Sequence, residues 1–269
     1  MKIIFDKKVL SDLIQNEKKL GFVPTMGALH LGHVSLIKKS IRQCNKSVVS
    51  IFVNKPQFNR KSDYTNYPRL LGKDILLLKK LKVDYLFLPK FNQIYPSGTN
   101  KKIKISSFSK KLCGKNRPGH FEAVVDVVER FIKIINPKRI YFGKKDMQQL
   151  KILESYISKK YSKIHVVGCE TVRENSGIAI SSRNLLLTSK QKIKASKVYK
   201  LIKKNKNNLI NGKLNNINIK KKILKLGITK IDYIKILDIN KIIKPYKRKN
   251  NFKVFIAFYL NKIRLIDNI

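Results

Sequence analysis

The feature that most constrains this fold is the alternation of short apolar runs with amphipathic helical segments over residues 1–172. Val48 to Val53 is a valine-rich apolar run, as expected of a strand that is covered on both faces. After His33, apolar residues recur at intervals of three and four, which is typical of a helix that packs one face on a sheet. Strands that alternate with such helices predict a parallel, doubly wound α/β sheet.

This pattern places expected strands at residues 2–5, 22–24, 48–53, 84–88 and 140–142, and expected helices at 9–20, from 33 onward, and at 74–81, 120–135 and 147–160. Beyond about residue 172 it changes to lysine-rich helices at 190–205 and 217–226 and β-rich segments at 233–237, 254–259 and 263–266. The sequence therefore predicts a Rossmann-like domain over residues 1–172 and a smaller α+β domain over residues 173–269.

The formal net charge of +44, taken alone, points to a nucleic-acid partner, because Lys and Arg neutralise phosphates. The lysines, however, occur in nearly every segment, together with many Ile and Asn. The sequence has no confined basic arm and no aromatic-interleaved RNA-binding signature. We therefore expect no specific nucleic-acid partner, and keep a basic nucleic-acid-binding protein as an alternative that salt-dependent binding would reveal.

The amino-terminal residues do not resemble a signal peptide, because the charged segment Asp6–Lys8 interrupts any apolar stretch. No later run reaches membrane-spanning length. Cys44, Cys113 and Cys169 are odd in number and lack C-x-x-C spacing, so neither a disulfide framework nor a zinc ribbon is indicated. We expect a cytoplasmic protein with no membrane partner.

The segment from Pro24 to His33, P-T-M-G-A-L-H-L-G-H, leaves a predicted strand, turns through two glycines and enters a helix. The N–H groups at a helix amino terminus bind phosphate, and glycines let a nucleotide approach the backbone. His30 and His33 can both donate to phosphate oxygens as negative charge develops there. The alternative without function is a pair of hydrogen-bonded histidines at a helix start.

The motifs that follow this segment are more specific. They are S-I-F-V-N at 50–54 with Gln57-Phe58, Y-P-R at 67–69, I-Y-P at 94–96, R-P-G-H-F at 117–121, F-G-K-K-D at 142–146 with Q-Q-L at 148–150, T-V-R-E at 171–174 and S-S-R-N at 181–184. Because these motifs occur in this order over residues 20–188, the sequence resembles the pantothenate synthetase family, the pantoate–β-alanine ligases. The resemblance implies ATP-dependent condensation of (R)-pantoate with β-alanine through a pantoyl adenylate, a homodimer, Mg²⁺ bound with ATP, and a lid role for the smaller domain.

The resemblance also implies roles for individual residues. His30, His33 and Lys145 are expected to be catalytic, with His33 matching the acid of the family. Gln57 and Gln149 are expected to hold pantoate, with Gln57 also contacting β-alanine. Asp74 is expected near the Mg²⁺, or else is an ordinary carboxylate at a helix amino terminus, and His120 could simply cap a helix. The expected ATP-binding residues are Met26, Gly27, His30, His33, Gly143, Lys144, Lys145, Asp146, Val172, Ile180, Ser181, Ser182 and Arg183.

The sequence departs from the family pattern at three places. The order Lys55-Pro56 reverses the usual N-P-x-Q-F, Lys144 replaces the glutamate of G-E-K-D, and Ile180 stands where Met or Leu is common. Another nucleotidyltransferase, one that adenylylates phosphopantetheine or charges tRNA, would share H-x-G-H. It should lack R-P-G-H-F and the pair Gln57 and Gln149.

Overall fold

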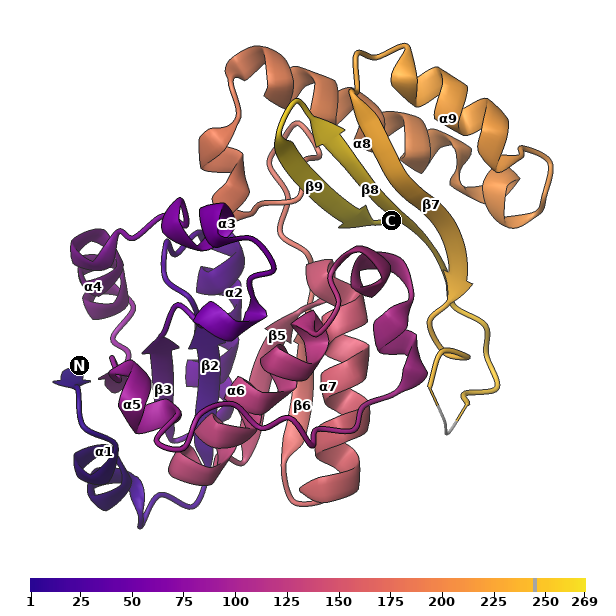
Figure 1. Ribbon diagram of the computed structural model, residues 1–269. Coiled ribbons are helices and arrows are strands. Elements are labelled where there is room, and N and C mark those ends of the chain that lie inside the picture. The colour runs from indigo at the N-terminus through magenta and orange to yellow at the C-terminus, as the bar shows by residue number, and fades with distance from the viewer. Residues whose placement is uncertain (244–245) are drawn as a thin grey trace. The chain divides into compact units, whose positions relative to one another are not determined.

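The chain forms two compact units in the computed structural model, which describes residues 1–243 and 246–269 (Figure 1). The first unit comprises residues 1–144 and 152–169, and the second comprises residues 145–151 and 170–269. The short segment 145–151 is tied to the second unit by a hydrogen bond of 2.7 Å from the Asn268 amide to the Lys145 carbonyl. The sequence predicts a single boundary after residue 172, and the division into compact units differs from it at residues 145–151 and 170–172.

The first unit, all of whose residues are described, is built on a parallel sheet with the strand order β1-β4-β3-β2-β5-β6. The sheet confirms the doubly wound fold that the alternating pattern predicts. Its central strands are fully buried, with Phe22, Val23, Val48 and Val49 at 0% exposure. The strands are β1 (Lys2–Ile4), β2 (Leu20–Thr25), β3 (Lys46–Ile51), β4 (Tyr85–Phe87), β5 (Arg139–Gly143) and β6 (His165–Cys169).

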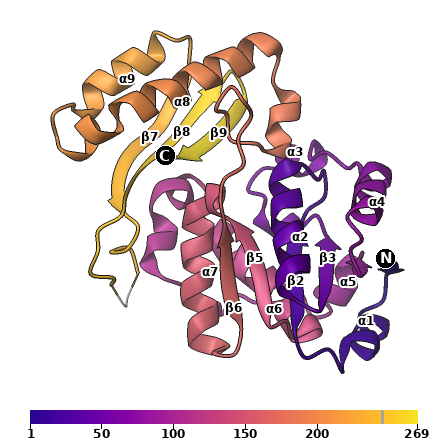
Figure 2. The ribbon, with the colours of Figure 1, turned by 180° about the vertical axis from the view of Figure 1, so that it is seen from behind.

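Helices cover both faces of this sheet. Leu36 and Ile37 of α2 pack with Leu78 of α4 on one face, and Phe131 of α6 packs against Phe22 on the other. Helix α6 lies on the near side of the sheet in Figure 1, and α2 lies on the near side in Figure 2. The helices are α1 (Lys7–Ile14), α2 (Leu31–Gln43), α3 (Lys61–Thr65), α4 (Leu71–Lys80), α5 (Phe91–Ile94), α6 (His120–Ile135) and α7 (Met147–Lys160), with 3₁₀ helices η1 (Lys55–Gln57), η2 (Ser107–Lys110), η3 (Leu112–Asn116) and η4 (Lys144–Asp146).

Helix α1 is shorter than the pattern predicts. The Asp6 carboxylate starts it by accepting from the N–H groups of Lys8 and Val9, at 2.7 and 3.1 Å. The helix ends at Ile14, and Leu20 belongs to β2, where it pairs with Lys46 of β3. A periodic apolar pattern does not show where a helix gives way to the next strand, because the residue can be buried in either.

The described part of the second unit contains an antiparallel sheet in the order β7-β8-β9, covered on one face by two helices. Val198 and Ile202 of the longer helix and Ile219 of the shorter one share a core with Ile256 and Phe258 of the central strand. This is the α+β fold that the sequence predicts. The elements are η5 (Ser182–Leu186), α8 (Ser189–Ile210), α9 (Asn216–Leu224), β7 (Lys230–Asp238), β8 (Phe252–Leu260) and β9 (Ile263–Asn268).

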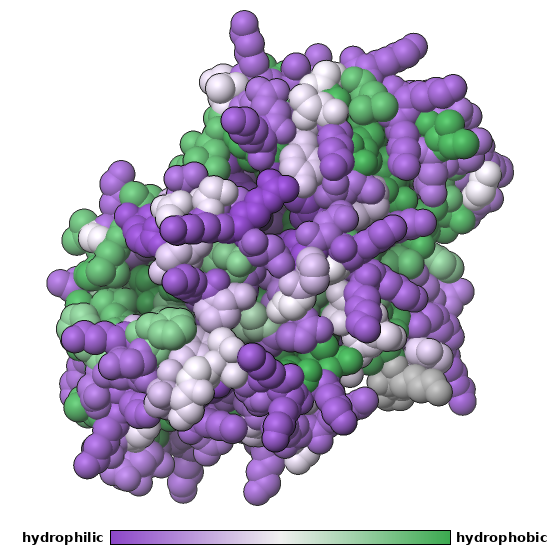
Figure 3. Space-filling view, in the orientation of Figure 1, coloured by the Kyte–Doolittle hydropathy of each residue, from purple (hydrophilic) through white to green (hydrophobic). Residues whose placement is uncertain are grey.

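Hydrophilic residues are spread over most of the face shown in Figure 3 and do not gather over one element. This agrees with a positive charge that is distributed along the whole sequence. Across residues 1–243 and 246–269, no helix combines the length and the apolar character that crossing a membrane requires.

Candidate functional site

Strands β2 and β5 are neighbours, and the chain proceeds outward from them in opposite directions, to β3 on one side and to β6 on the other. Such a reversal is a topological switch point, and ligands of doubly wound sheets bind beyond the carboxyl ends of strands there. The H-L-G-H segment follows the carboxyl end of β2, and Gly143 is the last residue of β5. The fold therefore places two predicted ATP-binding segments at the switch point.

The loop between β2 and α2 has a strained backbone. Gly27 and Ala28 have φ angles of 79° and 50°, in the region where a side chain is unfavourable by roughly 1–2 kcal/mol. Thr25 fixes the start of this loop, because its hydroxyl donates to the Ser50 carbonyl at 2.7 Å and accepts from the Gly27 N–H at 3.2 Å. A second support is needed to hold Ala28.

Asp74, in the first turn of α4, supplies that support. Its two carboxylate oxygens accept from the N–H groups of Ala28 and Leu29, at 2.9 and 2.8 Å. Successive N–H groups in such a turn form a concave site for an anion, and here the carboxylate fills it. Asp74 is 3% exposed, and this burial raises its pKa, while the two backbone hydrogen bonds act in the opposite direction.

These contacts leave the predicted place of Asp74 beside Mg²⁺ as a prediction, because each carboxylate oxygen accepts one hydrogen bond from the loop and has a second lone pair. Within the described residues, no group of three or more His, Cys, Asp or Glu side chains is arranged to hold a metal ion. The role of Asp74 that these contacts show is to hold the loop.

His30 and His33 cap the amino end of α2 reciprocally. The Nδ1 atom of His30 accepts from the Gly32 N–H at 3.1 Å, and the Nδ1 atom of His33 accepts from the His30 N–H at 3.4 Å. The two rings stack with centroids 4.0 Å apart. A neutral imidazole that accepts at Nδ1 carries its proton on Nε2, so Nε2 is the donor atom of each ring. A hydrogen-bonded pair of histidines at the helix start is therefore compatible with the expected donation to phosphate oxygens.

Gln57 lies at the end of η1, whose first turn contains Pro56. A proline is tolerated there because its missing N–H would have no helical partner. The Gln57 side chain accepts from the Asn54 amide at 3.1 Å and donates to the Met26 sulfur at 3.0 Å. The structure therefore brings a predicted pantoate residue into contact with a predicted ATP residue.

The R-P-G-H motif holds the backbone of Gln57. The Gln57 carbonyl lies 2.8 Å from Nδ1 of His120 and accepts from Arg117 at 3.3 Å. His120 is buried, and the residue at the N-cap of α6 is Gly119, so His120 does not cap this helix. Its role is to orient η1.

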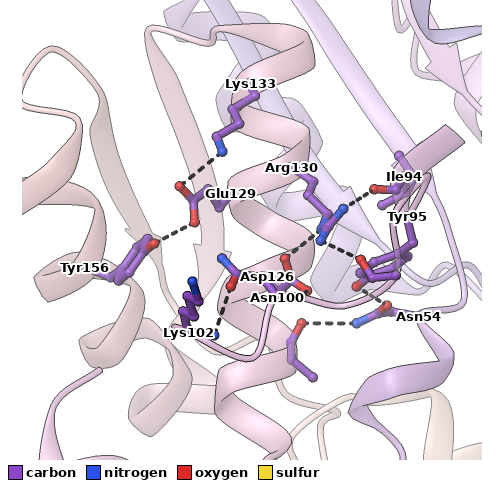
Figure 4. A network of polar contacts seen from close by, with 12 residues as sticks. Asn54, Ile94, Tyr95, Asn100, Lys102, Asp126, Glu129, Arg130, Lys133 and Tyr156 are labelled. Carbon is purple, nitrogen blue, oxygen red and sulfur yellow. Dashed lines mark hydrogen bonds and ion pairs between the residues drawn. The ribbon is translucent and has the colours of Figure 1, made fainter. Parts of the chain in front are cut away.

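A polar network beneath η1 was not predicted from the sequence. Asn54 is 1% exposed, donates to the Ala123 carbonyl at 3.3 Å, and accepts from the Tyr95 hydroxyl at 2.8 Å (Figure 4). Burial raises the pKa of Tyr95 well above its usual range, which keeps the hydroxyl protonated as a donor. Asn54 and Tyr95 both lie in motifs that the sequence shows, but their contact joins segments 41 residues apart.

Arg130 of α6 fastens the segment that carries Tyr95. It donates to Asp126 at 2.6 Å and to the carbonyls of Ile94 and Gly98 at 2.8 Å, and it lies 4.4 Å from the centre of the Tyr95 ring (Figure 4). The chain from Arg130 through Tyr95 and Asn54 to Gln57 is therefore continuous. These contacts hold the Gln57 side chain in place through the hydrogen bond from Asn54.

In the second unit, Lys145, Ser181 and Arg183 line one pocket. The Ser181 hydroxyl donates to the Asn184 side chain at 2.8 Å, which orders the turn into η5. The Lys145 ammonium lies 3.6 Å from the Asp146 carboxylate. Three of the expected ATP-binding residues thus converge within this unit.

The remaining predicted residues are placed as follows. Val172 and Ile180 are joined by a hydrogen bond of 3.0 Å from the Ile180 N–H to the Val172 carbonyl. Gln149 is partly buried near the start of α7, and Ser182 begins η5. The first unit carries Met26, Gly27, His30, His33, Gln57, Asp74, Gly143 and Lys144, and the second carries Lys145, Asp146, Gln149, Val172, Ile180, Ser181, Ser182 and Arg183.

Comparison with known sequences extends the resemblance to almost the whole chain. The family model described as pantoate-beta-alanine ligase matches residues 3–269. A pantothenate synthetase of Clostridium botulinum (strain 657 / Type Ba4) is 41% identical over 253 residues, which cover 93% of this chain and 90% of the relative. One of Thermosipho africanus (strain TCF52B) is 39% identical over 265 residues, which cover 97% of this chain and 95% of the relative.

Solved structures agree with the sequence comparison. The pantothenate synthetase of Thermus thermophilus superimposes with a TM-score of 0.89 at 32% identity, covering 100% of this chain and 99% of that one. The pantoate-beta-alanine ligase of Francisella tularensis, solved with beta-gamma ATP and beta-alanine, gives a TM-score of 0.87 at 37% identity, with 100% and 97% covered. The fold, the ordered motifs and these matches agree, and the chain belongs to the pantoate–beta-alanine ligase family.

Proposed function

We propose that this chain joins (R)-pantoate to β-alanine, using ATP and releasing AMP and pyrophosphate. In the first step a pantoate carboxylate oxygen attacks the α-phosphorus of ATP, and the bond from that phosphorus to pyrophosphate breaks. In the second step the amine of β-alanine attacks the acyl carbon of pantoyl adenylate, loses a proton, and AMP leaves. No protein nucleophile is required, so the residues act by positioning and by neutralising charge.

The observation that carries this proposal is the capped histidine pair at the switch point. The Nδ1 caps require neutral rings, so His30 and His33 present Nε2–H groups that can donate to phosphate oxygens. In this neutral form His33 is a hydrogen-bond donor at Nε2, and the acid role that the resemblance implies stays a separate prediction.

Lys145 and Arg183 supply positive charge for the leaving pyrophosphate, and Ser181 and Ser182 supply hydroxyl donors. Gln57 and Gln149 hold pantoate, because an amide can donate to a carboxylate and accept from a hydroxyl, and Gln57 also contacts β-alanine. Mg²⁺ enters with the ATP phosphates and neutralises part of their charge. The remaining ATP contacts are those that the motifs predict.

Three further properties belong to the same proposal. The second unit acts as a lid that excludes water from the adenylate, the protein is a homodimer, and it works in the cytoplasm. These rest on the family resemblance. Light scattering of the purified protein tests the dimer, and a monomeric mass at assay concentration would contradict it.

The deciding experiment measures pyrophosphate release from ATP and Mg²⁺ with and without pantoate, and pantothenate formation once β-alanine is added. We expect pyrophosphate release to depend on pantoate and not on β-alanine in a single turnover. Pyrophosphate release that is independent of pantoate, or no pantothenate with all three substrates, would overturn the proposal.

A further inference from the structure

A second cavity in the second unit, of about 290 Å³, is lined by four cationic side chains and by one carboxylate, that of the exposed Glu170. Arg173 comes from the loop after β6, Lys203 and Lys206 come from α8, and Lys253 comes from β8. The cavity shares Tyr199 and Ile269 with the pocket that holds Lys145, but none of these four cations lines that pocket. Thr171 and Arg173 belong to the T-V-R-E motif, but the proposed reaction assigns no role to any residue that lines this cavity.

Arg173 is compensated within the fold. Its guanidinium donates to both carboxylate oxygens of Asp267, at 2.7 and 2.9 Å, and lies 4.3 Å from the centre of the Tyr199 ring. Burial by itself would lower the pKa of Arg173, but the hydrogen bonds and the charge of Asp267 outweigh it and raise the pKa. Arg173 thus lines the cavity in a fixed position, and the carboxylate of Asp267 neutralises its charge.

The positive charges of Lys253 and Lys206 are not compensated to the same extent. The side chain of Lys253 is partly buried, and burial first, then the charge of Lys206, lowers its pKa. Glu170 and Asp267 oppose that shift, but Asp267 is already held by Arg173, and Glu170 is exposed. Two partly buried ammonium groups therefore repel one another in a confined space.

Confined like charges destabilise a fold unless an anion compensates them. Most lysines of this chain avoid the problem by lying in solvent, as Lys204 on α8 and Lys235 on β7 do. A cavity of about 290 Å³ is far larger than the roughly 15 Å³ that one water molecule needs. Its walls offer ammonium groups and the hydroxyl of Thr171, which are the donors that phosphate oxygens accept from.

We propose that this cavity binds a phosphate dianion, either inorganic phosphate or the phosphate group of a small phosphorylated compound, between Lys206 and Lys253. The cavity is lined by Thr171 and Arg173 but not by Val172, which lies between them. Alternate side chains of an extended segment point to opposite faces, so a bound phosphate would meet the reverse side of a segment expected to contact ATP.

The test is calorimetric titration with inorganic phosphate and, in a second arm, methyl phosphate, at about 0.15 M ionic strength, where contacts among exposed charges are largely screened. The variants Lys253→Met and Lys206→Met should each weaken binding at least tenfold, which is the loss of about one charge-assisted contact. The controls Lys204→Met and Lys235→Met, on the same helix and sheet but exposed, should change it less than twofold. Binding of methyl phosphate alone would identify a phosphorylated compound as the ligand source.

Two further measurements keep loss of binding distinct from loss of fold. Without phosphate, Lys253→Met should melt at or above the wild-type temperature, because it removes a repelled charge. Arg183→Ala, in the other pocket, should keep phosphate binding. Equal phosphate affinity in wild type and Lys253→Met overturns the proposal. Phosphate binding that is lost in Arg183→Ala but kept in Lys253→Met also overturns it, because the phosphate would then lie in the other pocket. Both outcomes are independent of the pyrophosphate assay that tests the proposed function.

Discussion

At the scale of single residues, much of this site consists of side chains that hold backbone rather than substrate. Asp74 holds the N–H groups of the loop between β2 and α2, and His120 holds the carbonyl of Gln57. The geometry of His30 and of Gln57 therefore depends on residues that need not touch a ligand. Substitutions at these supporting positions should affect binding and rate without removing a reacting group.

Asp74→Asn should disturb the loop between β2 and α2 selectively. An asparagine has one acceptor oxygen, so one of the two loop N–H groups loses its partner inside the protein, which destabilises the fold by about 1–3 kcal/mol. We expect the KM for ATP to rise at least tenfold with a smaller change in the KM for pantoate. Asp12→Asn, at an exposed position on α1, is the matched control for urea unfolding and kinetics. An unchanged KM for ATP would remove the assigned role.

His33→Ala and Lys145→Ala should each lower single-turnover pyrophosphate release by two or more orders of magnitude, as expected when charge stabilisation is lost. His33→Ala also removes a cap bond, which costs about 1 kcal/mol of stability, so circular dichroism must show that the fold persists. His165→Ala and Lys159→Ala, both exposed, are controls that should keep the wild-type rate. Near-normal pyrophosphate release by either site variant would contradict the assigned roles.

At the scale of elements, the sequence predicts long periodic segments well and short irregular ones poorly. Helices α6 and α7 have the bounds that their apolar periodicity predicts, residues 120–135 and 147–160. The 3₁₀ helices η2 and η3 were not predicted, because elements of four and five residues are too short to show a period. The loop role of Asp74 was missed because it depends on contacts with residues 45 and 46 positions away.

Glu129 joins α6 to α7 and gives this pair of helices a defined pH dependence. Its carboxylate accepts from Tyr156 at 2.6 Å, Tyr161 at 2.8 Å and Lys160 at 2.5 Å, and Figure 4 shows the contact with Tyr156. Burial alone would raise the pKa of Glu129, but these donors and the charge of Lys160 outweigh it and lower the pKa from 4.5 to about 2.

Because the folded pKa of Glu129 lies below its unfolded value, its stabilisation is fully present above about pH 4.5 and is lost as the pH falls towards 2. Glu129→Gln should therefore lower the free energy of unfolding by about 3 kcal/mol at pH 7, and by progressively less below pH 4.5. Urea unfolding of both proteins from pH 7 to pH 3 measures this, with Glu122→Gln on the same helix as control. A difference that stays constant with pH would contradict the assignment.

At the scale of the whole molecule, the motifs identify the family through residue 188, whereas the family model matches to residue 269. The last third is rich in Lys, Asn and Ile and offers few chemically distinctive residues to a motif. Its residues nevertheless contact the motifs, because the Asn268 amide donates to the Lys145 carbonyl and Asp267 accepts from Arg173. Such backbone and charge contacts have no sequence signature.

The net charge of +44 should have little specific consequence for nucleic acid. Hydrophilic residues are distributed over the visible face and not gathered into a stripe, so we expect only weak association with duplex DNA that disappears near about 0.15 M salt (Figure 3). Fluorescence anisotropy against salt concentration measures this. Nanomolar binding with sequence preference at that salt concentration would favour the nucleic-acid alternative.

The reciprocal caps at His30 and His33 give the two nitrogens of each imidazole different roles. Nδ1 accepts from the backbone, and Nε2 is available as a donor. A methyl group placed on one nitrogen or the other, by incorporation of Nδ1- or Nε2-methylhistidine, would have unequal effects. In a neutral ring, Nε2-methylation removes the donor and leaves Nδ1 as an acceptor for the loop, whereas Nδ1-methylation removes the acceptor and also leaves Nε2 without a proton. The Nε2-methyl ring would thus test the chemistry of the donor while the architecture of the loop stays in place.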